Sequence, residues 1–125
     1  MAEHTVKAFD EDITRLRGLI AEMGGLAEVA IQEAMQALVT GDEELAAGVV
    51  ERDLKLDRLE SEVDELAVRV IALRAPMADD LREIIAALKI AGVVERIGDH
   101  ATNVAEMVHY AATGHYPPDE REDDT

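Results

Sequence analysis

The sequence predicts an all-α protein that folds as an antiparallel, up-down-up three-helix bundle over residues 1–114. Apolar residues recur at alternating intervals of three and four over long stretches, as on one face of an amphipathic helix. Breaks near Gly41 and Pro76 separate these stretches, and such short connections make successive helices antiparallel. Hydrophobic residues make up 48% of the chain and aromatic residues only 2%, which favours aliphatic helix interfaces.

The first predicted helix ends before Gly41, which breaks the pattern. Gly24 and Gly25 lie inside it, and each costs about 1 kcal/mol relative to alanine. A local kink and the close approach of another helix are both open explanations for this pair. The predicted core positions of this helix are Phe9, Ile13, Leu16, Ile20, Met23, Ala27, Ala30, Ala34 and Leu38.

The second predicted helix begins after Asp42, whose side chain can cap it, and Glu43 and Glu44 suit the first turn. Arg74 suits its last turn, and Pro76 prevents its continuation. Arg52 falls where the apolar pattern expects a core residue. The predicted core positions are Leu45, Val49, Leu56, Leu59, Val63, Leu66, Val70 and Leu73.

The third predicted helix begins between Ala78 and Leu81 and runs to about Ala112, and Gly114 closes it. Residues 115–125 are predicted to be a disordered acidic tail. The small residues of this helix predict a face that packs tightly against a partner helix; they are Ala86, Ala87, Ala91, Gly92 and Gly98. Its predicted core positions are Ile90, Val94, Ile97, Ala101, Val104 and Val108.

The charge and the cysteine count exclude several classes of function. The formal net charge of −16 disfavours nucleic-acid and anionic membrane partners and favours metal cations or basic proteins. The absence of cysteine excludes disulfides and thiolate metal sites. No long apolar run or signal-peptide core is present, so we expect a cytoplasmic protein. No arrangement of nucleophile and base is evident, and we expect no enzyme.

Acidic residues form a stripe beside the apolar face of the second and third helices. Carboxylates clustered in this way are hard oxygen ligands for metal ions. In a chain with 28 acidic residues such spacings also arise by chance, and from spacing alone a solvated surface is the better-supported explanation. The stripes consist of Asp53, Asp57, Glu60 and Asp64 on one helix and Glu95, Asp99 and Glu106 on the other.

The segment "VVERIGDHATN" is unusual for a helix surface. Glu95, Asp99 and Asn103 stack at intervals of four, and like charges at that spacing repel by a few tenths of a kcal/mol. Gly98 adds a further cost in the same turn. A bound cation would remove the repulsion.

Four segments occur in the order seen in the PhoU family of bacterial phosphate-signalling regulators: "MGGLAEVAIQEAMQAL", "GDEELAAGVVERDLKLDRLE", "ALRAPMADDLREIIAALKI" and "VERIGDHATNVAE". The chain resembles that family from about Phe9 to Gly114. The resemblance implies E/D-x-x-x-D metal motifs that hold a divalent or trivalent ion such as iron, manganese, zinc or magnesium. Carried over to this chain, the metal-ligating residues are Asp53, Asp57, Glu95 and Asp99, with Asn103 one turn beyond.

The resemblance also implies a function. It predicts a negative regulator of phosphate uptake and phosphate-starvation signalling that contacts the ATPase of the phosphate-specific ABC transporter and a sensor histidine kinase. Such a protein is peripheral to the inner membrane only through its protein partners. The alternative is an acidic helical module that self-assembles without a ligand and has no regulatory activity of its own.

Family members typically contain two tandem three-helix bundles, whereas this chain contains one. Its beginning resembles the first repeat and its end, "HATNVAEMVHYAATGHYP", resembles the close of the second. A natural single-bundle member, a shortened gene and an artificial joining of the two ends are all consistent with this pattern. We expect a homodimer in which two copies stand in for the two repeats.

Overall fold

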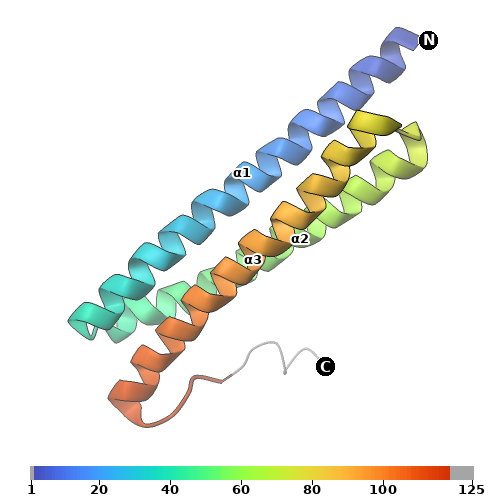
Figure 1. The fold of residues 1–125 in the computed structure, drawn as a ribbon. Coiled ribbons are helices and arrows are strands. Elements are labelled where there is room, and N and C mark those ends of the chain that lie inside the picture. Colours follow the sequence, from blue (N-terminus) through green and yellow to red (C-terminus); the bar gives the residue numbers. More distant parts are fainter. Residues whose placement is uncertain (1, 119–125) are drawn as a thin grey trace.

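The computed structural model of the protein describes residues 2–118, and side chains from residue 6. It contains three helices: α1 (Ala2–Thr40), α2 (Glu43–Arg74) and α3 (Ala78–Thr113). Figure 1 shows them side by side, with α1 and α3 running in the same direction and α2 in the opposite one. Every pair of helices is in contact. The predicted all-α, up-down-up bundle is therefore confirmed.

The helix ends lie where the capping residues predict them. Gly41 adopts the left-handed region at φ 70°, and the side chain of Asp42 accepts a hydrogen bond of 3.0 Å from the backbone N–H of Leu45. Gly114 is also left-handed, at φ 79°, and its N–H donates to the carbonyl of Tyr110. Ala75 takes the same role after α2 at φ 44°, a conformation that costs an alanine about 1 kcal/mol.

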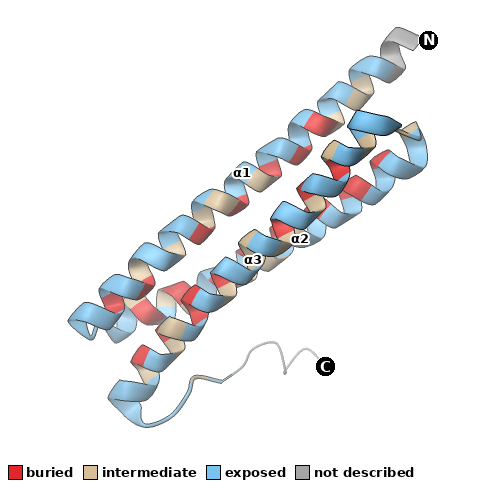
Figure 2. Cartoon of the chain, viewed as in Figure 1, coloured by how far each residue is buried: buried red, intermediate tan, exposed pale blue. Residues whose placement is uncertain are grey.

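The core lies along the inner faces of the three helices, where Figure 2 shows the buried positions. Larger side chains fill the part nearest the α2–α3 turn, with Met23, Val63 and Ile84 fully buried. Small side chains dominate the other end, where Ala34 and Ala105 are buried beside Val49. Alanines at these positions bring the helix axes close together, because less side-chain volume separates them.

Four predicted core positions are wrong: Leu38, Leu73, Ile90 and Ile97 are exposed by 52%, 65%, 48% and 36%. The third helix instead buries smaller residues, including Ala91 and Gly98. A pattern weighted by hydrophobicity favours the larger side chains. The bundle buries the face that allows close packing, and this face is rich in alanine and glycine.

The core register of α2 also differs from the predicted one at its midpoint. Arg52 is exposed and pairs with Glu33 of α1. The adjacent Asp53 is instead turned inward and is only 6% exposed. An inward-facing carboxylate is unusual in a core of aliphatic side chains, because burial removes its hydration.

Gly98 is required by packing within the chain. A Cβ atom at this position would overlap the side chain of Leu56 and lie 3.2 Å from Oδ1 of Asp53. The predicted close approach at Gly98 is therefore confirmed, and α2 is the neighbour. Among the described residues, and apart from the surrounding turn of the same helix, no atom lies within 4 Å of a Cβ built at Gly24, Gly25 or Gly92. Packing within the chain does not explain those three glycines.

The predicted acidic tail falls largely outside the described residues, because residues 119–125 are not among them. Residues 115–118 follow α3 as non-helical chain. Across the part of the chain that the structure describes, no helix combines the length and apolarity needed to cross a membrane.

Candidate metal centre

Three carboxylates converge between α2 and α3. One oxygen each from Asp53, Asp57 and Asp99 lies within 4.8 Å of the other two. Asp53 and Asp57 are one turn apart on α2, so they occupy the same side of that helix. Asp99 comes from α3 and adjoins Gly98, whose missing side chain lets the helices approach. Asp53 is buried, and Asp57 and Asp99 are half-buried.

Two glutamates extend this cluster. The pKa of Glu95 is raised from 4.5 to about 7 by burial, by a hydrogen bond with the Asp99 side chain, and by the negative charges of Asp99, Glu60 and Asp57. Burial also raises the pKa of Glu60, to which the charges of Asp64, Asp57 and Asp99 contribute. Burial and the neighbouring carboxylates therefore both disfavour a negative charge on Glu95.

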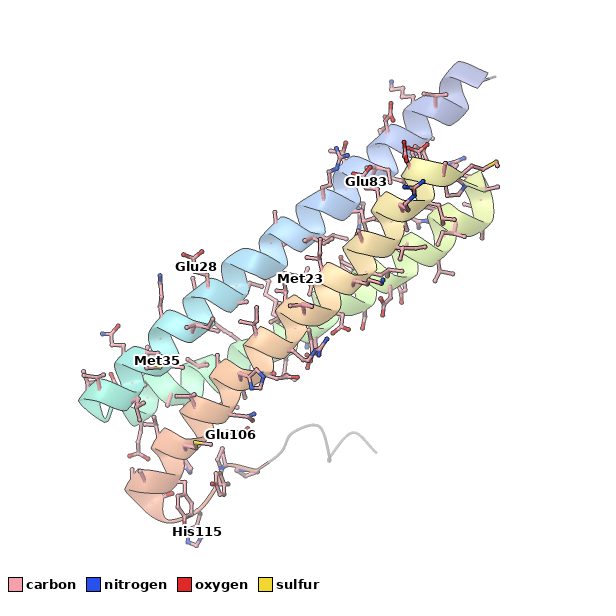
Figure 3. All side chains as sticks on the ribbon, in the orientation of Figure 1. Met23, Glu28, Met35, Glu83, Glu106 and His115 are labelled. Carbon is pink, nitrogen blue, oxygen red and sulfur yellow. The ribbon has the colours of Figure 1, made fainter. Side chains whose placement is uncertain are left out.

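The cluster lies at the side of an open groove of about 740 Å³ between α2 and α3. Its apolar wall includes Val50 and Leu54 of α2, and its polar wall includes Glu106 of α3, which Figure 3 labels. Asn103 is exposed and lines the same groove as Asp53 and Asp99. Asn103 therefore extends the predicted set along the groove, although it is not one of the three converging residues.

Thr102 supplies a further polar group to this groove. Thr102 is only 7% exposed. Its hydroxyl oxygen is buried and has no hydrogen-bond partner among the described residues. A buried hydroxyl without a partner costs about 1–3 kcal/mol, so it favours a ligand or an ordered water in the groove. The donor set is therefore compatible with a cation: several carboxylates and one unsatisfied hydroxyl, all of them oxygen ligands.

The chain that follows α3, up to residue 118, contributes to the groove. The rings of Tyr110 and Tyr116 stack with centroids 4.7 Å apart, which folds the chain back after Gly114. Pro117 and Pro118 then line the groove together with residues of α2 and α3. The groove is therefore not formed by the helices alone.

Of the predicted metal ligands, three converge in the structure: Asp53, Asp57 and Asp99. A fourth, Glu95, forms a hydrogen bond with Asp99. The apolar pattern does not predict the inward orientation of Asp53, because it places the adjacent Arg52 near the core. It does not predict the burial of Thr102 either. Its signal is its position seven residues after Glu95, which puts both residues at the same heptad position facing α2.

Comparison with known proteins identifies the family. Residues 20–108 match the PhoU domain family. The chain is 55% identical over 105 residues to a protein of Zymomonas mobilis named phosphate-specific transport system accessory protein PhoU homolog, a match that covers 84% of this chain and 44% of the relative. Proteins of the same name from Caulobacter vibrioides and Rhizobium meliloti are each 45% identical, over 85% and 84% of this chain and 46% and 44% of theirs.

The chain spans about half the length of the curated relatives it matches. The region that matches the family nevertheless includes all of α2, most of α3, the second half of α1 and all of the converging carboxylates. The chain belongs to the PhoU family.

Proposed function

We propose that this protein is a PhoU-type negative regulator of phosphate uptake and phosphate-starvation signalling, and that it acts as a metal-binding helical adaptor. Its relatives are named as accessory proteins of a phosphate-specific transport system. The convergence of Asp53, Asp57 and Asp99 is the observation that carries the metal-binding part of this proposal.

The geometry of the three carboxylates suits a single ion. Oxygen ligands lie about 2.0–2.6 Å from Mg²⁺ or Ca²⁺, so two of them on opposite sides of one ion are separated by about 4–5 Å. The three carboxylate oxygens lie within 4.8 Å of one another. The converging set contains no histidine, which favours magnesium, manganese or iron over zinc.

A bound ion would change the electrostatics of the bundle. It would neutralise the repulsion among the carboxylates of α2 and α3 and favour the ionised form of Glu95, whose pKa is raised to about 7 in its absence. It would also link the two helices directly. The proposed role of the ion is to hold α2 and α3 in the arrangement that the partner proteins recognise.

The partners that we propose are the ATPase of the phosphate-specific ABC transporter and a sensor histidine kinase. The formal net charge of −16 attracts basic surfaces and increases the rate of encounter with them. The groove that the described residues form between α2 and α3 is open, and an open groove suits an adaptor better than an enzyme.

The first experiment measures metal and partner binding with one pair of variants. Asp57→Asn with Asp99→Asn removes two converging carboxylates while keeping their size. Glu62→Gln with Glu65→Gln removes two exposed acids of α2 and is the matched control. We expect the wild type and the control to bind one ion by elemental analysis, and the Asp57/Asp99 variant to lose at least tenfold in affinity for Mn²⁺.

At ion concentrations of about 100 times Kd, binding adds about 2.7 kcal/mol, which corresponds to a rise in Tm of about 10 °C for a domain of this size. We expect the metal-loaded wild type, and not the Asp57/Asp99 variant, to bind the purified ATPase and the cytoplasmic part of the kinase. The metal site would be contradicted if the wild type contained no metal by elemental analysis and its Tm did not change when the ion was added. Absence of binding to either partner would contradict the adaptor role and favour the ligand-free assembly module.

A further inference from the structure

The groove between α2 and α3 extends beyond the converging carboxylates. Its lining runs from Ala46 to Leu54 on α2 and from Asp99 to His109 on α3. At a rise of 1.5 Å per residue, these stretches are about 12 Å and about 15 Å long. That length accommodates about four residues of an extended polypeptide, at about 3.3 Å each. With a volume of about 740 Å³, the groove has room for a segment of another protein beside an ion.

The carboxylates of the groove have no basic counterpart in its lining. Four acidic residues line the groove, and among the described residues no lysine or arginine does so. A divalent ion would compensate two of these four formal charges and leave two. A segment that covers the groove therefore has to bring cationic groups, because covering carboxylates without compensation is unfavourable. The four residues are Glu51, Asp53, Asp99 and Glu106.

Two of these acids, Glu51 of α2 and Glu106 of α3, are not among the converging carboxylates. Glu106 follows Asp99 by seven residues, so the two lie on the same side of α3. Glu51 precedes Asp53 on the antiparallel helix α2, so it lies toward the same end of the groove as Glu106. Negative charge therefore continues along the groove, away from the ion site and toward the end of α3.

An apolar line runs along α2 beside these charges. Ala47, Val50 and Leu54 follow one another at intervals of three and four residues, so they lie on one side of the helix. Ala47 is exposed, and Val50 and Leu54 are half-buried. An occupant of the groove can contact all three. The groove consequently suits a segment that carries apolar as well as cationic side chains.

Thr102 is an independent indication that the groove takes an occupant. Its side chain is buried in the lining, and its hydroxyl has no hydrogen-bond partner among the described residues. It follows Asp99 by three residues and precedes Glu106 by four, so it lies between them on the same side of α3. A backbone group of a segment bound in the groove would satisfy this hydroxyl.

The chain after α3 adds a rigid apolar surface to the groove. The stacking of Tyr116 on Tyr110 positions this chain, in which Pro117 and Pro118 belong to the lining. A proline ring fixes φ and has no backbone N–H, so these two residues offer apolar contact without an unpaired donor. A surface that is already rigid loses little conformational entropy when a partner binds.

We propose that this groove is the docking site for a partner protein, which contributes an extended segment carrying both lysine or arginine and apolar side chains. This inference rests on the adaptor role proposed above and assigns that role to one surface. The cationic side chains pair with Glu51 and Glu106, and the apolar ones contact Val50 and Leu54. The ion remains at the converging carboxylates and links the two helices that form the groove.

The first test separates the groove from the overall charge. Glu51→Gln with Glu106→Gln removes two charges from the groove, keeps the size of the side chains and retains the converging carboxylates. Glu62→Gln with Glu65→Gln removes two charges from exposed positions of α2 outside the lining. Titration calorimetry with Mn²⁺ in about 0.15 M NaCl measures the Kd of each protein for the ATPase and for the cytoplasmic part of the kinase.

We expect the Glu51/Glu106 variant to raise the Kd at least about tenfold for any partner that the wild type binds, because it removes charges that the partner covers. The Glu62/Glu65 variant has the same net charge and should change the Kd less than about twofold, because its charges stay in solvent. The Mn²⁺ content of all three proteins should be equal by elemental analysis. A lower content in the Glu51/Glu106 variant would contradict the separate role of these two acids.

The second test locates the partner on the surface. The chain contains no cysteine, so Ala47→Cys adds a single thiol to the groove. Val68→Cys adds one elsewhere on α2, at a residue that is 65% exposed. Mass spectrometry of this chain follows the reaction of each thiol with a maleimide. We expect a bound partner to slow the reaction at position 47 at least about fivefold, as covering the site requires, and to leave position 68 unaffected.

Equal losses of affinity in the two glutamine variants would overturn the docking site. An unchanged reaction rate at position 47 in the complex would overturn it too, and both results would leave the adaptor role standing. If neither partner binds the wild type, the adaptor role itself fails and the docking site fails with it.

Discussion

Asp53 is a carboxylate of α2 next to the position of Arg52, which the heptad pattern assigns to the core, and it is only 6% exposed. Its neighbours include Asp57 and Asp99, so the side chain enters a site where negative charge is already concentrated. Burying charge in this way is unfavourable unless a partner compensates for it. A cation bound by several of these carboxylates is the compensation that the residue types indicate.

Glu95 provides a prediction about pH. Its pKa is raised to about 7 in the folded protein from 4.5 in the unfolded chain, so the folded state binds more protons between these values. The free energy of unfolding of the metal-free protein therefore falls as the pH rises from about 4.5 to about 7. Glu95→Gln removes this contribution and should stabilise the metal-free protein at pH 8 by about 1 kcal/mol, after allowance for solvent screening.

Urea denaturation of the chelated protein at pH 5 and pH 8 measures this difference. We expect the gain from Glu95→Gln to be present at pH 8 and nearly absent at pH 5. Glu62→Gln, an exposed acid of α2, is the control and should show little change between the two values. An equal gain from Glu95→Gln at both pH values would contradict the predicted ionisation of Glu95.

At the scale of the elements, α3 separates three environments around its circumference. One face packs small residues such as Ala91 and Ala105 into the core. A second carries Glu95 and Asp99 toward α2. The third presents apolar side chains such as Ile90 beside α1. A single helix can serve all three because residues seven apart repeat the same orientation.

Gly98 and Gly92 provide a matched pair on this helix. Gly98→Ala would force a methyl group into the buried side chain of Leu56 and toward Oδ1 of Asp53, so we expect a loss of about 1–2 kcal/mol despite the better helix propensity of alanine. The methyl group of Gly92→Ala meets no atom of another helix among the described residues, so this change should stabilise the protein by about 0.5–1 kcal/mol. Thermal and urea unfolding of the metal-free proteins measures both effects.

Gly98→Ala should also weaken metal binding, because the displaced Leu56 and Asp53 widen the space between α2 and α3. Gly92→Ala should leave the affinity for the ion unchanged. If Gly98→Ala stabilised the protein as much as Gly92→Ala, the close contact between the two helices would not restrict this position.

At the scale of the whole molecule, the formal net charge of −16 opposes the compact state. Several ion pairs offset part of this repulsion and join α1 to the other two helices. Lys55 pairs with Glu22 at 3.8 Å and Arg74 with Asp12 at 3.8 Å, and all four side chains are partly exposed. Pairs of this kind contribute at most about 1 kcal/mol each.

Salt should therefore stabilise the metal-free protein. Raising NaCl from 0.05 to 0.5 M screens the repulsion among the acidic residues more than it weakens the exposed ion pairs, so Tm should rise by several degrees. The increase should be smaller when an ion is bound, because the acidic cluster is then partly neutralised. Thermal melts followed by circular dichroism, with chelator and with Mn²⁺, measure the rise in Tm for the metal-free and the metal-bound protein. KCl serves as the control for specific ion effects. A Tm that falls with salt would show that the ion pairs dominate.

Local patterns in the sequence predict where the helices end and which residues share one side of a helix. Asp42 marks the start of α2 and Gly114 marks the end of α3. The side chain of Asp42 and the backbone N–H of Gly114 each satisfy an unpaired group at a helix end, and this depends only on neighbouring residues. The spacing of Asp53 and Asp57 places them on one side of α2 by helix geometry alone. The helical character of the chain and the helix boundaries follow from interactions within about one turn.

The tertiary structure decided what depends on the relative placement of residues far apart in the sequence. Whether Asp99 meets Asp53 depends on the register of α3 against α2, and that register follows from the contact at Gly98. The exposure of Ile90 and Ile97 likewise depends on which face of α3 packs most closely. Hydrophobic periodicity shows that a helix has an apolar side, but close packing among three helices selects which residues are buried and which carboxylates converge.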